Sequence, residues 1–235
     1  MQLRVAARTH VGCKRKVNED ALLDRPDLGL WAVADGMGGH KSGDVASALV
    51  IESLGAGPLN GALSDRIDEV RVRLLAANTR LIELRTDKNA TIGTTVVALV
   101  VEGPAFGCLW AGDSRAYRLR DGVLIQLTRD HSLVQDLVDL GEVAAADARD
   151  HPNANVITRA VGASGALEID LVTGEVRPGD IYLLASDGLT KVVEDAEIET
   201  RLREPDVNAL ADGLIALCLD RGAPDNVAVV VLQAR

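Results

Sequence analysis

Four aspartates stand where an apolar, strand-like run of the chain begins or ends. Asp35 follows the run 30–34, Asp113 follows 108–112, Asp187 follows 181–186, and Asp225 precedes 227–232. Buried strands that each stop at a carboxylate would bring several acids to one rim of a sheet. Gathered carboxylates repel one another and are costly to bury unless a cation compensates. Hard divalent ions such as Mg²⁺ and Mn²⁺ take oxygen ligands, so the pattern suggests a site for such ions.

Tight turns are the competing interpretation, because Asp-Gly is among the commonest turn dipeptides. Asp121-Gly122 lies between two strand-like runs and predicts a hairpin, and Asp212-Gly213 lies in a helical stretch. Asp35-Gly36 and Asp187-Gly188 differ because each ends a strongly apolar run. By spacing alone, these two dipeptides fit a metal site and a turn equally well.

The segment 35–40 is dense in glycine directly after a strand-like run. It is neither a Walker loop nor a dinucleotide-binding fingerprint, because neither pattern occurs in the chain. Glycines beside an aspartate can instead let a backbone carbonyl approach a cation that the aspartate binds.

The elements that must position these residues are clustered strands with a few helices. Strand-like runs are expected at 3–9, 30–34, 94–101, 105–111, 116–120, 123–127, 169–176, 181–185 and 227–232. Helices are expected at 43–54, 64–85 and 207–219, the second with Ser64 as N-cap and an apolar stripe from Ile67 to Leu84. Because the strands do not alternate strictly with helices, the chain favours an α+β layered fold over a parallel βαβ sheet.

Composition and charge narrow the function classes. The 235 residues carry 35 acidic and 25 basic side chains, for a net charge of -10, and only 2% are aromatic. Nucleic acid is therefore not an expected partner, since a phosphate backbone requires a basic footprint. The longest apolar runs are too short to span a membrane, and three scattered cysteines predict no disulfide framework, so we expect a cytoplasmic protein. A monomer is the default expectation for its oligomeric state. One domain covering 1–235 is expected, with an exposed flap at 142–155.

Eight short segments of the chain match the motifs of a single protein family, both in their residue types and in their order along the chain. They are 12–20 (with Arg15 and Asn18-Glu19-Asp20), 35–40 with Gly43, Thr91–Thr95, Gly112–Arg115, Thr128–Ser132, Asn155–Gly162, Ser186–Leu189 and Asp225–Val227. This series resembles the metal-dependent serine/threonine protein phosphatases of the type 2C (PPM) family, in their compact bacterial form. The resemblance implies a four-layer αββα sandwich, in which two central antiparallel sheets are flanked by helices.

The resemblance also implies a metal site. Asp35 would bridge two divalent ions, Mn²⁺ or Mg²⁺, with the Gly36 carbonyl on one of them, and Asp187 and Asp225 would complete the other ion's ligands. Bacterial members often hold a third, weaker ion, which here would use Asp113 together with Asp187. Glu19 and Asp20 would orient metal-bound waters.

The implied reaction is hydrolysis of phosphoserine and phosphothreonine in proteins, by direct attack of a water that bridges the two metals. Arg15 matches the family's phosphate-binding arginine, whose planar fork suits two phosphate oxygens. The general acid is open: position 37, a histidine in some members, is Met37 here, which leaves His40, a metal-bound water or no specific group. His131 is expected to be structural. The implied partners are phosphorylated proteins and a bacterial Ser/Thr kinase that the enzyme opposes.

Two other functions compete with this one. A catalytically silent member would bind phosphoproteins as a sensor, but such proteins usually lack a metal aspartate and none is missing here. A calcium-binding module is disfavoured because the EF-hand spacing is absent and the acids are spread along the chain.

Overall fold

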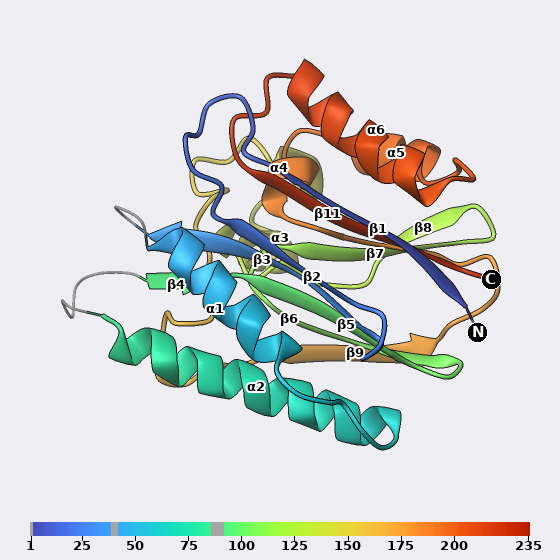
Figure 1. Ribbon diagram of the computed structural model, residues 1–235. Coiled ribbons are helices and arrows are strands. Elements are labelled where there is room, and N and C mark those ends of the chain that lie inside the picture. The colour runs from blue at the N-terminus through green and yellow to red at the C-terminus, as the bar shows by residue number, and fades with distance from the viewer. Residues whose placement is uncertain (1, 39–41, 86–91) are drawn as a thin grey trace.

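The structure is a computed structural model that describes residues 2–38, 42–85 and 92–235. Two sheets are stacked face to face, and helices cover the outer face of each (Figure 1). Within the described residues every paired strand runs antiparallel to its neighbour. The predicted α+β fold with two central antiparallel sheets between helices is therefore confirmed. Gly39, His40, Lys41 and Thr91, which belong to or adjoin the predicted motifs, lie outside the described residues.

One sheet contains both ends of the chain. Its strands, in spatial order, are β1 (Leu3–His10), β11 (Val227–Ala234), β10 (Ile181–Ala185), β7 (Arg115–Arg120) and β8 (Val123–Gln126). The turn between β7 and β8 is the predicted hairpin, and Asp121 and Gly122 have φ of 52° and 78°. Positive φ at both central residues is the geometry that suits a two-residue hairpin.

The other sheet is formed by the strands that lie between. Their order is β2 (Asp20–Arg25), β3 (Leu30–Gly38), β5 (Val96–Glu102), β6 (Ala105–Ala111) and β9 (Asp170–Glu175), and β4 (Ile92–Thr94) pairs with the end of β3. The apolar core between the sheets includes Trp31, Leu99 and Val230. Phe106 of one sheet meets Tyr182 of the other edge to face, with ring centroids 5.3 Å apart.

Helices close the sandwich on both sides. Helices α1 (Gly43–Gly55) and α2 (Leu63–Glu83) cover the sheet of β3, while α4 (Asp187–Thr190) and α6 (Val207–Asp220) cover the sheet of β11. Helix α5 (Asp195–Arg201) packs on α6 and β8. Helix α3 (Leu133–Asp139) and the 3₁₀ turn Ala145–Asp147 lie in the segment between β8 and β9.

Helix α2 shows what the periodic pattern predicted well and where it was wrong. Ile67 and Leu81 of its apolar stripe are buried, but Leu84 is exposed because it follows the last helical residue. The helix begins at Leu63 with Ala62 as N-cap, so the prediction of Ser64 as N-cap was wrong. The Asp65 carboxylate accepts the Ala62 backbone N–H at 3.0 Å, which satisfies a donor at the helix start without a serine hydroxyl.

Two further predictions concern the cysteines and a possible membrane span. All three cysteines are described and are free thiols, Cys13 exposed and Cys108 and Cys218 buried, as predicted. In the part of the chain that the structure describes, no helix combines the length and the apolar character needed to cross a membrane.

Candidate active site

The predicted acids meet at one end of the sandwich. Because neighbouring strands are antiparallel, the end of one strand lies beside the start of the next. Asp20 opens β2 and is the direct cross-strand partner of Asp35 in β3. The other three acids come from segments that adjoin strand ends: Asp113 follows β6, Asp187 opens α4 directly after β10, and Asp225 precedes β11.

Burial raises the pKa of three of these carboxyl groups. Asp35 is half-buried and lines the site, and the burial of its carboxyl group together with the charges of Asp187 and Asp20 holds its pKa well above the usual range. Burial raises the pKa of Asp20 to about 7, although the Ser186 hydroxyl donates to it at 2.8 Å. Burial likewise raises the pKa of Asp113 to about 7. Such a group of buried carboxyls is stable in its charged form only with nearby positive charge.

Thr95 fixes the end of β3 to the turn that carries Asp113. The Asp35 N–H donates to the Thr95 hydroxyl at 3.2 Å, and the Thr95 N–H donates to the Asp35 carbonyl at 2.9 Å. The Thr95 hydroxyl is also 2.6 Å from the hydroxyl of Ser114. Thr95 and Ser114, one from each of two predicted motifs, therefore form a common support for the acids.

Gly36 is required by the close approach of three backbone segments. A Cβ atom there would lie 2.0 Å from the Gly43 carbonyl oxygen and 2.7 Å from that of Glu19. The Gly36 N–H donates to the same Glu19 oxygen at 3.1 Å. Gly36 thus packs backbone against backbone beside Asp35. The role expected from the sequence, that of letting a carbonyl approach a bound cation, stays a prediction.

Arg15 lies at the mouth of the site and pairs with Asp225, with Nη2 2.7 Å from Oδ2. Both side chains are substantially exposed, at 51% and 40%. The hydrogen bond to Asp225 and its charge raise the pKa of Arg15. An exposed guanidinium with donors to spare can turn toward a phosphate group.

Asn226 holds the Arg15 loop in place, a role that sequence reasoning did not assign. Its side-chain oxygen accepts the Glu19 N–H at 2.8 Å. Its amide donates to the carbonyls of Val11 and Val17 at 2.9 and 3.0 Å. The only signal in the sequence was its place beside Asp225.

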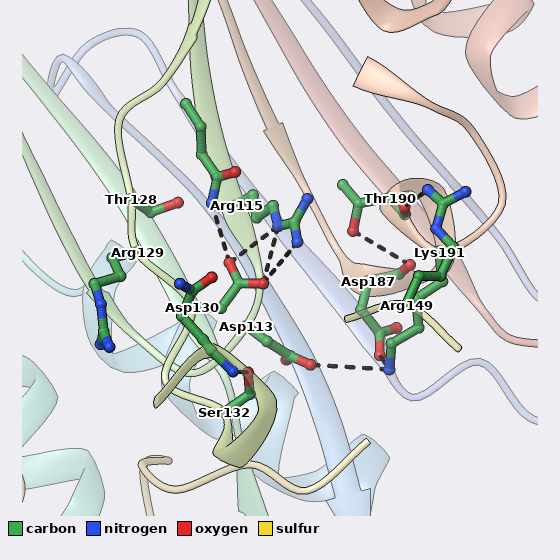
Figure 2. Close-up of polar contacts among 12 residues, drawn as sticks. Asp113, Arg115, Thr128, Arg129, Asp130, Ser132, Arg149, Asp187, Thr190 and Lys191 are labelled. Atoms are coloured by element: carbon green, nitrogen blue, oxygen red, sulfur yellow. Dashed lines mark hydrogen bonds and ion pairs between the residues drawn. The ribbon is translucent and has the colours of Figure 1, made fainter. Parts of the chain in front are cut away.

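Lys191 is the second residue that sequence reasoning missed. Its ammonium group is paired with Asp187 and lies 3.9 Å from Asp113 Oδ2 (Figure 2). It also donates to the Asn155 side-chain oxygen at 2.6 Å. Burial would lower the pKa of Lys191, but the charges of Asp187 and Asp113 outweigh it and raise the pKa. The available signal was the spacing of four residues from Asp187, which places both on one helix face.

Two cavities meet at these residues. The first, of about 670 Å³, is lined by Arg15, Glu19, Asp35, Asp187 and Asp225 among others, and so contains most of the predicted site. The second, of about 920 Å³, extends between the segment 145–155 and α5. Asn155, Asp187 and Lys191 line both cavities, so the two are neighbours along this row of side chains.

His131 supports the Asp113 turn. It is buried, its ring stacks on Trp110, and its Nδ1 accepts the Gly112 N–H at 3.1 Å. Asp130 beside it binds the Arg115 guanidinium at 2.8 to 3.0 Å (Figure 2). These contacts agree with the structural role expected of His131. Burial lowers its pKa, which keeps the imidazole neutral.

The candidate side chain for the general acid, His40, lies outside the described residues. Met37, which stands where some family members have histidine, is in β3 and lines the first cavity.

The oxygen atoms that the residues of this site offer are suitable ligands for hard divalent ions. Asp35, Asp187 and Asp225 line one cavity beside Gly36, and all offer oxygen atoms. Across residues 2–38, 42–85 and 92–235, no three Asp, Glu, His or Cys side chains already stand close enough together to hold an ion. One oxygen of Asp187 is paired with Lys191 and one oxygen of Asp225 with Arg15 in this arrangement, so a divalent ion would use the other oxygen of the carboxylate or displace the paired cation.

Comparison with known proteins identifies the family. A family model described as protein phosphatase 2C matches residues 13–222. The chain belongs to the protein phosphatase 2C family. Its predicted membership, drawn from eight motifs, is thereby confirmed.

Relatives of this 2C-family chain are serine/threonine phosphatases by name. It is 41% identical to PstP of Mycobacterium tuberculosis over 97% of its own length and 44% of the length of PstP. It is 34% identical to the phosphatase Stp of Listeria monocytogenes, covering 96% of this chain and 94% of Stp. The chain thus spans less than half of PstP but nearly all of Stp.

Solved structures agree with the fold. PppA, described as a regulatory component of T6SS in Pseudomonas aeruginosa, matches with a TM-score of 0.93 and 44% identity, covering 100% of this chain and 99% of that one. The PstP catalytic domain in complex with two manganese ions matches with a TM-score of 0.85 and 40% identity, covering 98% and 97% of the two chains.

Proposed function

We propose that the protein hydrolyses phosphoserine and phosphothreonine side chains of other proteins, and that residues 1–235 form one catalytic domain. The observation that carries the proposal is the convergence of Asp35, Asp187 and Asp225 with Arg15 around one cavity. Three carboxylates that can bind metal through oxygen and one guanidinium that can hold two phosphate oxygens line a single cavity. A phosphate ester that binds beside divalent ions requires both kinds of group. The serine/threonine phosphatases PstP and Stp, which resemble the chain over almost all of its length, support the same substrate class.

Two divalent ions, Mn²⁺ or Mg²⁺, complete the proposed site. The residues that would hold these ions are Asp35, the Gly36 carbonyl, Asp187 and Asp225. When bound, the ions act as Lewis acids that lower the pKa of the attacking water and offset the charge of the phosphoryl group. The manganese complex of PstP supports this assignment.

The protein's own side chains have separate tasks in this proposal. Arg15 leaves Asp225 and holds two phosphate oxygens, which orients phosphorus for in-line attack. Glu19 and Asp20 accept hydrogen bonds from water in the site and so direct the attacking lone pair. Asp20 is itself fixed by the Ser186 hydroxyl at 2.8 Å. His40 remains the candidate side chain for protonating the leaving oxygen.

The proposed partners follow from the substrate class. A bacterial Ser/Thr protein kinase would supply the phosphoproteins that this enzyme dephosphorylates. We place this activity in the cytoplasm and in a monomer, and the free thiols of the three cysteines support a reducing compartment. The alternative of a catalytically silent phosphoprotein sensor gains no support, since all the predicted metal aspartates are present.

Hydrolysis of a phosphothreonine peptide with Mn²⁺, without Mn²⁺ and with EDTA tests the proposal. Asp35→Asn keeps the shape of the side chain and should abolish turnover, while Asp68→Asn, on the exposed face of α2, is the matched control. Activity that survives both EDTA and Asp35→Asn would refute the mechanism. Peptide binding without turnover at saturating Mn²⁺ would indicate the sensor instead.

A further inference from the structure

Lys191 occupies the place where the family resemblance suggests a third ion. That ion would use Asp113 and Asp187, and the Lys191 ammonium group is paired with Asp187 and stands 3.9 Å from Asp113 Oδ2 (Figure 2). Its third neighbour is the Asn155 oxygen at 2.6 Å. An ammonium group has three N–H donors, and three side-chain oxygens of the chain surround it.

The backbone fixes where this ammonium group can reach. Asp187 is the first residue of α4, and Lys191 caps the end of the same helix, with its N–H donating to the Asp187 carbonyl at 2.8 Å. The two side chains are therefore i, i+4 neighbours on one face of a single turn. The Lys191 side chain is 35% exposed, so most of its surface is already enclosed by the site.

The contacts leave a third divalent ion at a disadvantage. An ion between Asp113 and Asp187 would meet a positive charge that already uses an oxygen of Asp187, and at a few ångströms like charges repel strongly in a partly buried site. It would also have to break the contact with Asn155, which ends the segment that lines the larger cavity. The residues present thus fit a fixed ammonium group better than a third ion.

We infer that Lys191 supplies a built-in positive charge in place of a third divalent ion, so that this chain binds two ions where the resemblance implies three. The inference rests on the proposed function for the two other ions. It also assigns Lys191 as a positioning residue, because the ammonium group connects the metal-binding Asp187 to Asn155 of the neighbouring segment. A substrate that enters along the larger cavity then passes the side chains of Lys191 and Asn155.

Counting bound ions tests the inference without relying on turnover. Wild-type protein, Lys191→Asp and Lys16→Asp are dialysed against Mn²⁺ at several concentrations, and the ratio of manganese to chain is measured by elemental analysis. Lys191→Asp should bind one ion more than the wild type, because a carboxylate replaces the ammonium group between Asp113 and Asp187. Lys16→Asp makes the same change of charge on an exposed residue near Arg15 and should leave the ratio unchanged.

Thermal unfolding with and without Mn²⁺ provides a second measurement. Lys191→Asp should be less stable than the wild type in EDTA, since three carboxylates then meet, and should gain more from Mn²⁺ than the wild type does. Lys191→Asn, which adds no negative charge, keeps the test valid if the aspartate variant does not fold, and it should also bind the additional ion, at higher Mn²⁺ concentration.

The outcomes separate this inference from the proposed function. A wild-type protein that binds three ions, or a Lys191 variant that binds no more than the wild type, would overturn the inference and leave the phosphatase proposal standing. If Lys16→Asp bound the same number of additional ions, the inference would also be overturned, because the gain would then come from the change in net charge and not from the position of Lys191. A wild-type protein that binds no Mn²⁺ would overturn the proposed function itself, and with it the basis of the inference.

Discussion

Replacing Asp113 by asparagine should stabilise the metal-free protein at pH 8. The carboxyl group is buried, its Oδ1 has no hydrogen-bond partner among the described residues, and burial raises its pKa from 3.8 to about 7. The attraction of Lys191 acts in the opposite direction and is already included in that value. Asparagine has nearly the same shape and carries no charge at any pH, so it removes the cost of burying the carboxylate.

The sign and the size of the effect follow from the two pKa values. Below about pH 4 the group is protonated in both states and has little influence on stability. Between pH 4 and 7 the folded chain binds more protons than the unfolded chain, so the free energy of unfolding falls as pH rises. Above pH 7 the loss is complete and amounts to about 4 kcal/mol, from a pKa difference of roughly three. Asp113→Asn should recover most of it, a rise in Tm on the order of 10 °C.

Urea unfolding in EDTA at pH 8 and pH 5 measures this directly. The gap in the free energy of unfolding between Asp113→Asn and the wild type should shrink by about 3 kcal/mol from pH 8 to pH 5, because the folded wild type is protonated at the lower pH. Asp68→Asn, at an exposed position of α2, should show almost no gap at either pH. A variant that is no more stable than the wild type at pH 8, or a gap that does not depend on pH, would refute the reasoning.

Three further substitutions test other parts of the site. Arg15→Lys should lower kcat/KM for a phosphothreonine peptide by about 10- to 100-fold, because an ammonium group cannot hold two phosphate oxygens as a fork; unchanged steady-state kinetics would exclude a phosphate-binding role. Gly36→Ala should weaken Mn²⁺ binding in calorimetry, since its Cβ would lie 2.0 Å from the Gly43 carbonyl oxygen; wild-type affinity would show that the backbone there can adjust. Asn226→Ala removes three hydrogen bonds and should cost about 2–4 kcal/mol in urea unfolding, and a loss below 1 kcal/mol would mean that the Arg15 loop is held in another way.

The strands of the fold were predictable where both of their faces are buried. β5, β10 and β11 lie inside the sandwich and appear in the sequence as continuous apolar runs. β2 escaped prediction because it is an edge strand with only two buried residues, and its sequence DALLDR begins and ends with charged side chains. Helices α3 and α5, of 7 residues each, were also missed, since so short a helix depends on its packing partners more than on its own pattern.

The acids of the site were predictable for a different reason. Asp35, Asp113, Asp187 and Asp225 each stand at the boundary of an apolar run, and the antiparallel order of the sheets brings those boundaries together. Their supports could not be found in this way, because a hydrogen bond such as that from Asn226 to Val17 joins positions 209 residues apart. Lys191 was within reach of sequence reasoning, four residues after Asp187, but its approach to Asp113 depends on the fold.

The two cations of the site differ in how firmly they are held, and this difference bears on their roles. Arg15 is 51% exposed and makes one ion pair, with an Asp225 that is itself 40% exposed, so a divalent ion that takes Asp225 would release the guanidinium for phosphate. Lys191 is held by Asp187 and Asn155 and lies close to Asp113, in a more enclosed position. An ion that binds Asp187 through its other oxygen can leave the ammonium group in place. On the proposed function, loading the site with metal therefore frees one positive charge to bind substrate and keeps the other to hold the acids together, within a chain whose net charge of -10 would otherwise repel a phosphorylated protein.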